Sequence, residues 1–183
     1  ETGRYGLGFA KDYNEKSKEE LLRMLATPSS DRHFIMYEAL RKGATVDEIF
    51  DITKVKHYFV EQMKELVEEE EAIAKSKGSL PSDEQLISAK KNGFSDKYLS
   101  QILAIPEDDI RNKRIELGIE EAWEGVHVSG TKDSAYYYST YNAKDKNSVS
   151  EEKNKIMILG GGPNRIGQGI EFDYCCVHAA LAL

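Results

Sequence analysis

The stretch whose residue types could most readily do chemistry is a glycine-rich turn close to the C-terminal end. Residues 160–162 are three consecutive glycines that follow a short apolar run. Glycines between a strand and a helix allow backbone amides to approach an anion at the helix N-terminus. The dinucleotide fingerprint, however, finds Arg165 in place of its third glycine, and the phosphate-loop template finds Gln168 and Gly169 where it requires Lys and Ser or Thr. The pattern predicts a glycine-rich turn in an α/β domain, with a nucleotide site as the alternative.

Histidine and cysteine residues lack the spacing of a metal site. The four histidines lie far apart in the sequence: His33, His57, His127 and His178. None of them stands at ligand spacing from another histidine or from the cysteine pair, so we expect surface or packing roles and no bound metal. Cys175 and Cys176 are neighbours within an apolar segment, where a thiol behaves as a small hydrophobe. We expect them to be inert, with a reactive pair as the alternative, and we expect no catalytic residues and no bound cofactor in this chain.

The charge and hydropathy of the chain narrow the classes of partner. A formal net charge of −7 argues against nucleic acid, because a phosphate backbone requires a dense basic surface. No apolar run approaches the ~18 residues of a membrane helix, and no signal-like segment begins the sequence. Two adjacent cysteines cannot close a disulfide framework, which favours a reducing, cytoplasmic location. The acidic run 68–71 predicts a solvated helix face rather than a binding tail.

Short helices with their own start and stop signals are predicted from Ser17 to about Leu117. Three capping boxes mark helix starts, namely Ser17 with Glu20, Thr45 with Glu48, and Ser82 with Gln85. Glycines mark the helix ends at Gly43, Gly78, Gly93 and Gly118. The longest helix is predicted from about Lys54 to Lys75. Its buried stripe is expected to comprise Phe59, Met63, Leu66 and Val67.

The pattern changes after Gly118. Residues 122–140 are richer in β-branched and aromatic residues and lead into the tyrosine block 136–141, for which we expect packing against a neighbouring domain rather than stacking on nucleic-acid bases. Residues 156–159 predict a buried parallel strand, and residues 170–183 predict an apolar helix. No returning strand follows, so we expect a piece of a longer protein.

The run Gly160–His178, GGGPNRIGQGIEFDYCCVH, resembles the opening of the second, carbamoyl-phosphate-forming half of carbamoyl phosphate synthetase large subunits. Upstream, Asp31–Gly43 and the segments 50–53 and 136–141 are similar to the oligomerisation domain of the same subunit. The first twelve residues are similar to the end of its first half. The segment His127–Asp133 departs from the family, which often carries a different and longer stretch there, and this puts in doubt the contact made at that place.

The resemblance implies an ATP-grasp ligase that uses two ATP with Mg or Mn, bicarbonate and glutamine-derived ammonia, in pyrimidine and arginine biosynthesis. Its partners would be other copies of the large subunit and a glutaminase small subunit, with no nucleic acid and no membrane. The ATP sites would lie outside this segment, and the chain alone would be inactive. By position in the motif, Gly169 and Glu171 resemble residues near the wall of the family's carbamate tunnel.

These observations predict a mainly α fold, formed by a multi-helix oligomerisation domain with a short truncated βα start of the next domain. The expected divisions are a tail at 1–16, the helical domain at 17–142, a linker at 143–154 and the βα start at 155–183. Two other hypotheses remain open, a free-standing helical interaction module and a small nucleotide-binding α/β protein.

Overall fold

The computed structural model describes residues 3–8, 13–126, 137–145, 151–159 and 169–183, with side chains in the last range described from residue 174 onward. The chain divides into two compact units, Glu1–Asn147 and Ser148–Leu183, each of which is described by itself. The glycine-rich turn at 160–168 and the segment His127–Asp133 lie outside the described residues.

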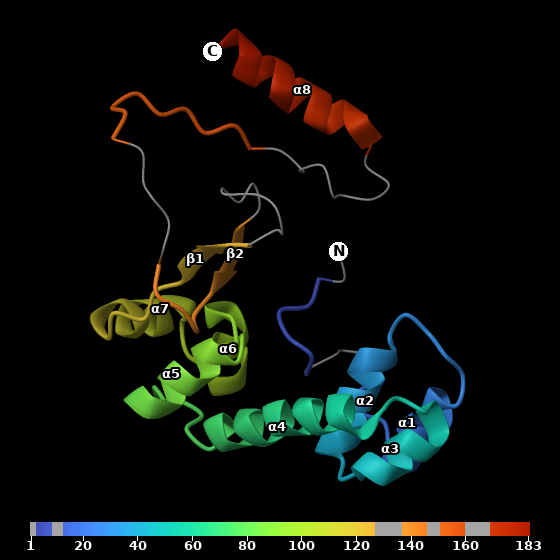
Figure 1. Cartoon of the computed structure of the whole chain (residues 1–183). Helices are drawn as coiled ribbons and strands as arrows, with labels where there is room; N and C mark the ends of the chain where they lie inside the picture. Colours follow the sequence, from blue (N-terminus) through green and yellow to red (C-terminus); the bar gives the residue numbers. More distant parts are fainter. Residues whose placement is uncertain (1–2, 9–12, 127–136, 146–150, 160–168) are drawn as a thin grey trace. The chain divides into compact units, whose positions relative to one another are not determined.

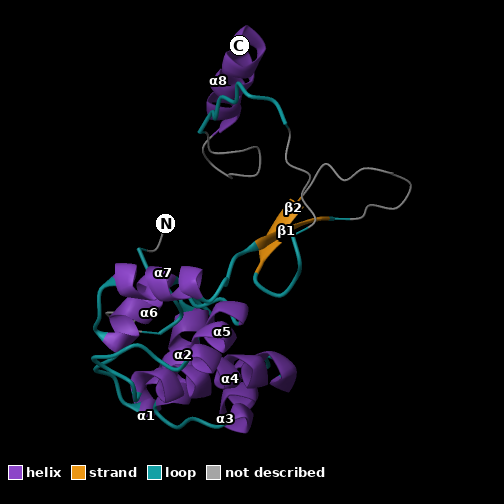
Figure 2. Ribbon diagram, turned by 90° about the vertical axis from the view of Figure 1, so that its left-hand side faces the viewer, coloured by secondary structure: helices purple, strands orange, loops and turns teal. Residues whose placement is uncertain are grey.

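The described residues of the first unit form seven helices (Figures 1 and 2). They are α1 (Lys18–Leu25), α2 (Arg32–Arg41), α3 (Val46–Thr53), α4 (His57–Ala74), α5 (Asp83–Lys91), α6 (Asp96–Leu103) and α7 (Glu107–Glu116). An antiparallel ribbon follows, in which β1 (Ala122–Gly125) pairs with β2 (Tyr137–Thr140) and Trp123 lies opposite Ser139. The mainly α fold expected from the sequence is confirmed.

Most helix ends form where the sequence predicts them, but α4 begins at His57 and not near Lys54, which ends α3 in a left-handed conformation. All three capping boxes are present, with the Ser17, Thr45 and Ser82 side chains accepting from the third helical amide. All four stop glycines have positive φ between 65° and 89°, a region that residues with a Cβ rarely adopt. These local signals therefore mark at least one end of α1 to α5 and of α7, and both ends of α5.

Two apolar clusters lie along α4, which runs between them (Figure 1). The first buries the inner faces of α1, α2, α3 and the N-terminal part of α4, with Leu21, Leu25 and Ile49 fully buried. The second buries the end of α4 with α5, α6 and α7, around Ile73, Leu86 and Leu99. Leu66 contacts both clusters. Because one helix serves two cores, its orientation fixes how the two helix groups meet.

Two sequence expectations about α4 are wrong. Phe59 is 61% exposed, and Val60 takes the buried position in its place. Glu70 is only 2% exposed, whereas the sequence predicted a solvated face for residues 68–71. The acidic run winds around the helix, so one of its four members must face inward. At that position Glu70 lies three residues after Val67 and three before Ile73, both of which are buried.

The second unit contains α8 (Gly169–Ala182), which confirms the predicted apolar helix. The strand predicted at 156–159 is not formed. Those residues have no regular secondary structure, and their side chains are exposed, with Met157 at 83% and Leu159 at 86%. A parallel strand exists only by hydrogen bonding to a neighbour, and the described residues offer it none.

Candidate functional site

The sequence-predicted tunnel residues lie at the start of α8. Gly169 is the first residue of that helix and Glu171 follows in its first turn. The side chain of Glu171 is outside the described atoms, so the tunnel assignment stays a prediction. In the rest of α8, Tyr174 and His178 contact each other with ring centroids 4.1 Å apart, and the two cysteines are free thiols, Cys175 being exposed.

The most organised polar site lies instead in the first unit, around the buried carboxylate of Glu70. The Tyr37 hydroxyl on α2 and the Tyr98 hydroxyl on α6 each donate to Glu70 Oε2 at 2.6 Å. Arg41, also on α2, forms an ion pair with Glu70 Oε1. We call these four residues the Glu70 cluster. It joins one helix from each apolar core to the helix that both cores share.

Burial and charge in the Glu70 cluster raise the pKa values of its two tyrosines and its arginine. Burial, together with the adjacent Glu70 charge, raises the pKa of both Tyr37 and Tyr98, so both hydroxyls stay protonated and remain donors. Burial works against the charged form of Arg41, but the carboxylates of Glu70 and Glu38 outweigh that effect and raise its pKa. The Glu70 carboxylate thus lies among three donors from two other helices, an arrangement that suits an internal fastening.

A glycine segment crosses directly over this cluster. A Cβ added to Gly8 would lie 2.8 Å from Glu70 Oε2 and would overlap Arg41 and the Tyr98 hydroxyl. A Cβ on Gly6 would lie 2.6 Å from the Tyr98 ring. Ser95 Oγ also donates to the Tyr5 carbonyl at 3.2 Å. Residues 3–8 thus form a strap whose backbone approaches the cluster more closely than any side chain would allow.

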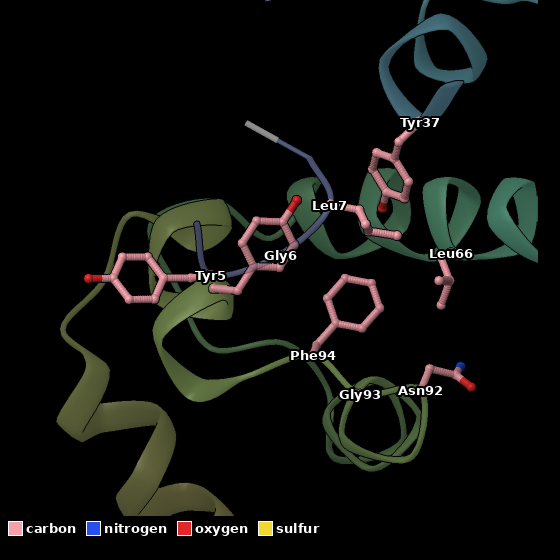
Figure 3. A pocket seen from close by; sticks show the side chains of 9 residues that line it. Tyr5, Gly6, Leu7, Tyr37, Leu66, Asn92, Gly93 and Phe94 are labelled. Atoms are coloured by element: carbon pink, nitrogen blue, oxygen red, sulfur yellow. The ribbon is translucent and has the colours of Figure 1, made fainter. Parts of the chain in front are cut away.

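A small open cavity of about 140 Å³ lies beside the strap. Figure 3 shows Leu7, Tyr37, Leu66 and Phe94 around it, with the Tyr5 ring projecting away from it. The lining is mostly apolar and aromatic, with Asn92 as its amide-bearing member. The cavity marks imperfect packing between the strap and the two cores and shows no group arranged for catalysis.

A second polar cluster fastens α5, α6 and α7 to one another. Lys90 Nζ, on a side chain only 4% exposed, contacts Asp96 Oδ1 at 2.8 Å and donates to the Phe94 carbonyl. Arg114 Nε contacts Asp96 Oδ2 at 3.1 Å. Burial tends to raise the pKa of Asp96, but the hydrogen bond and charge of Lys90, with help from Arg114, lower it overall. The Tyr141 ring lies 4.9 Å from Lys90 Nζ and so connects the ribbon to this cluster.

Sequence reasoning missed the Glu70 cluster, although a signal for it was present. Glu70 lies at helical spacing between Val67 and Ile73, and Arg41 follows Tyr37 by one turn of α2. Charged residues inside an apolar stripe are buried only when they are paired. Of the described histidines, His57 Nε2 lies 2.9 Å from Asp47 Oδ1 and His33 is exposed.

No described group of three or more His, Cys, Asp or Glu side chains is arranged to hold a metal ion. Within the same described residues, none of the helices has the length and apolarity needed to span a bilayer.

Comparisons with known proteins match both ends of the chain to one enzyme. Residues 1–118 match the family described as carbamoyl-phosphate synthetase large chain, oligomerisation domain. Residues 152–183 match the carbamoyl phosphate synthase preATP-grasp domain.

Similar curated proteins extend the match over the whole chain. The carbamoyl phosphate synthase large chains of Nostoc sp. and Pseudomonas aeruginosa are 40% and 41% identical over 186 and 189 residues. The arginine-specific large chain, chloroplastic, of Arabidopsis thaliana is 40% identical over 187 residues. Each alignment covers 100% of this chain but only 16–17% of the relative, so the chain spans about a sixth of their length.

Proposed function

This chain belongs to the carbamoyl phosphate synthase large-chain family, and from that premise we propose that it is the segment through which such a large chain self-associates and joins its two halves. The observation that carries the proposal is identity of 40–41% to large chains along the full length of the chain. Residues 1–118, which match the oligomerisation domain, contain all seven helices of the first unit.

We further propose that the parent enzyme is an ATP-dependent ligase that makes carbamoyl phosphate from bicarbonate, glutamine-derived ammonia and two ATP, with Mg or Mn. A glutaminase small subunit would supply the ammonia, and the product would serve pyrimidine and arginine synthesis. The name of the Arabidopsis relative supports the arginine route. On the same family match, Gly169 and Glu171 are proposed to lie beside the passage that carries carbamate. A carboxylate there would hold a polar intermediate through hydrogen bonds.

The geometry of the first unit suits a connecting role. The Glu70 cluster joins its two cores, and residues 3–8 lie against that cluster. The ion pairs of Asp96 with Lys90 and Arg114 fasten α5, α6 and α7 to one another. A rigid spacer of this kind would hold the two halves of a large chain at a fixed separation. Polar clusters that join helices in this way favour one arrangement over competing ones.

A segment exchange tests the proposal. This chain would replace the matching sixth of the Pseudomonas aeruginosa large chain, and carbamoyl phosphate formation would be measured with the small subunit present. We expect the hybrid to retain activity within about tenfold, because the ATP sites would lie outside the exchanged segment. A hybrid that folds and binds ATP but forms no carbamoyl phosphate would contradict the proposed role.

A further inference from the structure

The corner between α3 and α4 exposes a group of adjacent apolar side chains. Tyr58 is 64% exposed and Phe59 is 61% exposed, and their rings contact edge to face with centroids 5.4 Å apart. Ile52, on the last turn of α3, adds a side chain that is 38% exposed. Exposed apolar residues that stand singly are ordinary, but contiguous aromatic ones indicate a contact surface.

Several local contacts hold this corner in place. The Phe50 and His57 rings stack with centroids 4.2 Å apart, and His57 Nε2 lies 2.9 Å from Asp47 Oδ1. Lys54 takes a left-handed backbone conformation between the two helices and places its ammonium 5.1 Å from the Phe50 ring. A surface fixed before association loses less conformational entropy when it is covered.

The distribution of charge along α4 also distinguishes this corner. Residues 51–61 carry two acids, Asp51 and Glu61, and two lysines, Lys54 and Lys56. Residues 65–71 carry five glutamates and no base. Two copies of a chain with net charge −7 repel each other, and they repel least where acids and bases balance. A two-fold contact moreover requires a self-complementary patch, in which the lysines of one copy can face the acids of the other.

We propose that the corner formed by Ile52, Tyr58 and Phe59 is the centre of the contact between two copies of this chain, and that the surrounding lysines and acids form its rim. This inference rests on the proposed self-association and specifies the surface that makes it. The corner lies within the region that matches an oligomerisation domain, which is why a second copy is the chosen partner. Aromatic residues at the centre of an interface carry a disproportionate share of its affinity.

Sedimentation velocity on the 183-residue chain over a concentration series tests the surface. We expect the wild type to form a dimer reversibly, and the double variant Tyr58→Ser with Phe59→Ser to raise the dissociation constant at least tenfold, a change worth about 1.4 kcal/mol. The matched control is Ile115→Ser on α7, which removes another apolar side chain that is 57% exposed and should leave association unchanged. Far-UV circular dichroism verifies that all variants are folded.

The outcomes separate the two proposals. A wild type that stays monomeric at every concentration contradicts self-association itself and, with it, this surface. A wild type that dimerises while the double variant dimerises equally well overturns only the surface, and the corner would then be covered by another part of the large chain. Rescue by Tyr58→Phe with Phe59→Leu, which keeps the apolar area, supports the inference.

Discussion

The two units of the chain differ in whether their apolar side chains are buried or exposed. In the first unit, Leu21, Ile49, Leu86 and Leu99 have no exposed surface, and each helix places one face against another. In the second unit, the described side chains of residues 156–159 and most of α8 are exposed, although α8 itself is formed. Both units contain strongly apolar sequence, so composition does not distinguish them.

The difference lies in what each element requires from the rest of the chain. A helix satisfies its backbone hydrogen bonds internally, so α8 forms while its side chains remain in water. A strand needs a neighbour for every hydrogen bond, so residues 156–159 stay irregular. The first unit contains partners for all its helices, and buried polar clusters hold those partners in one arrangement.

The largest expected effect comes from breaking the Glu70 cluster. Arg41→Met removes the guanidinium and leaves the Glu70 carboxylate buried without its ion pair, which typically costs about 3–5 kcal/mol of unfolding free energy. Urea denaturation measures the change. Arg23→Met on α1, an exposed position, is the control and should change stability by less than about 0.5 kcal/mol. Equal stability of the two variants would show that the cluster does not hold the cores together.

A smaller effect is expected at the strap. Gly8→Ala places a methyl group where Arg41, Tyr98 and Glu70 already stand, so residues 3–8 must lift or the cluster must open. Overpacking of this kind costs roughly 1–3 kcal/mol. Chymotrypsin cleavage after Tyr5 should accelerate, and hydrogen exchange of the strap should rise. Thr27→Ala, at an exposed position outside the strap, is the control. An unchanged cleavage rate in Gly8→Ala would contradict the clamped strap.

Sequence reasoning predicted most of this fold but not its polar fastening. The capping boxes at Ser17, Thr45 and Ser82 are local, since each involves residues three apart, and all of them form. The Glu70 cluster joins residues 28 to 33 positions apart. No local pattern specifies which tyrosine meets which glutamate. The strand predicted at residues 156–159 does not form. An apolar run favours a strand, but the strand also needs a neighbour to hydrogen-bond with, and the run itself does not provide one.

Acid should weaken the first unit through Asp96. Because the pKa of Asp96 is lowered in the folded chain, the carboxylate stabilises the fold above its unfolded pKa of about 3.9, and this contribution is lost as the pH falls through the folded value. Thermal melting between about pH 5 and pH 2 should therefore show a shallower acid limb in Asp96→Asn than in the wild type. Asp108→Asn, whose carboxylate is 80% exposed, is the control. Parallel acid limbs in Asp96→Asn and the wild type would exclude Asp96 as a contributor.

The smallest expected effect is also the most direct test of the contrast between the two units. Deleting everything after Asn154 removes α8 and residues 155–159, whose described apolar side chains are largely exposed, such as Met157 at 83% and Leu181 at 79%. A side chain that stays in water does not contribute the roughly 1.5–3 kcal/mol that burial would give. The unfolding free energy of the helical unit, measured by urea denaturation, should therefore change by no more than a surface substitution would, within about 0.5 kcal/mol.

The solubility of the variant that lacks residues 155–183 should equal or exceed that of the full chain, because exposed apolar surface promotes association. The helical circular dichroism signal at 222 nm should decrease only by the contribution of α8. Melting of the remaining helices should stay cooperative. If the shortened chain instead lost its helices in one step, residues 155–183 would belong to the same folding unit as α1 to α7. The division of the chain into two compact units argues for independence, since a segment can stabilise a core only through surface that it buries.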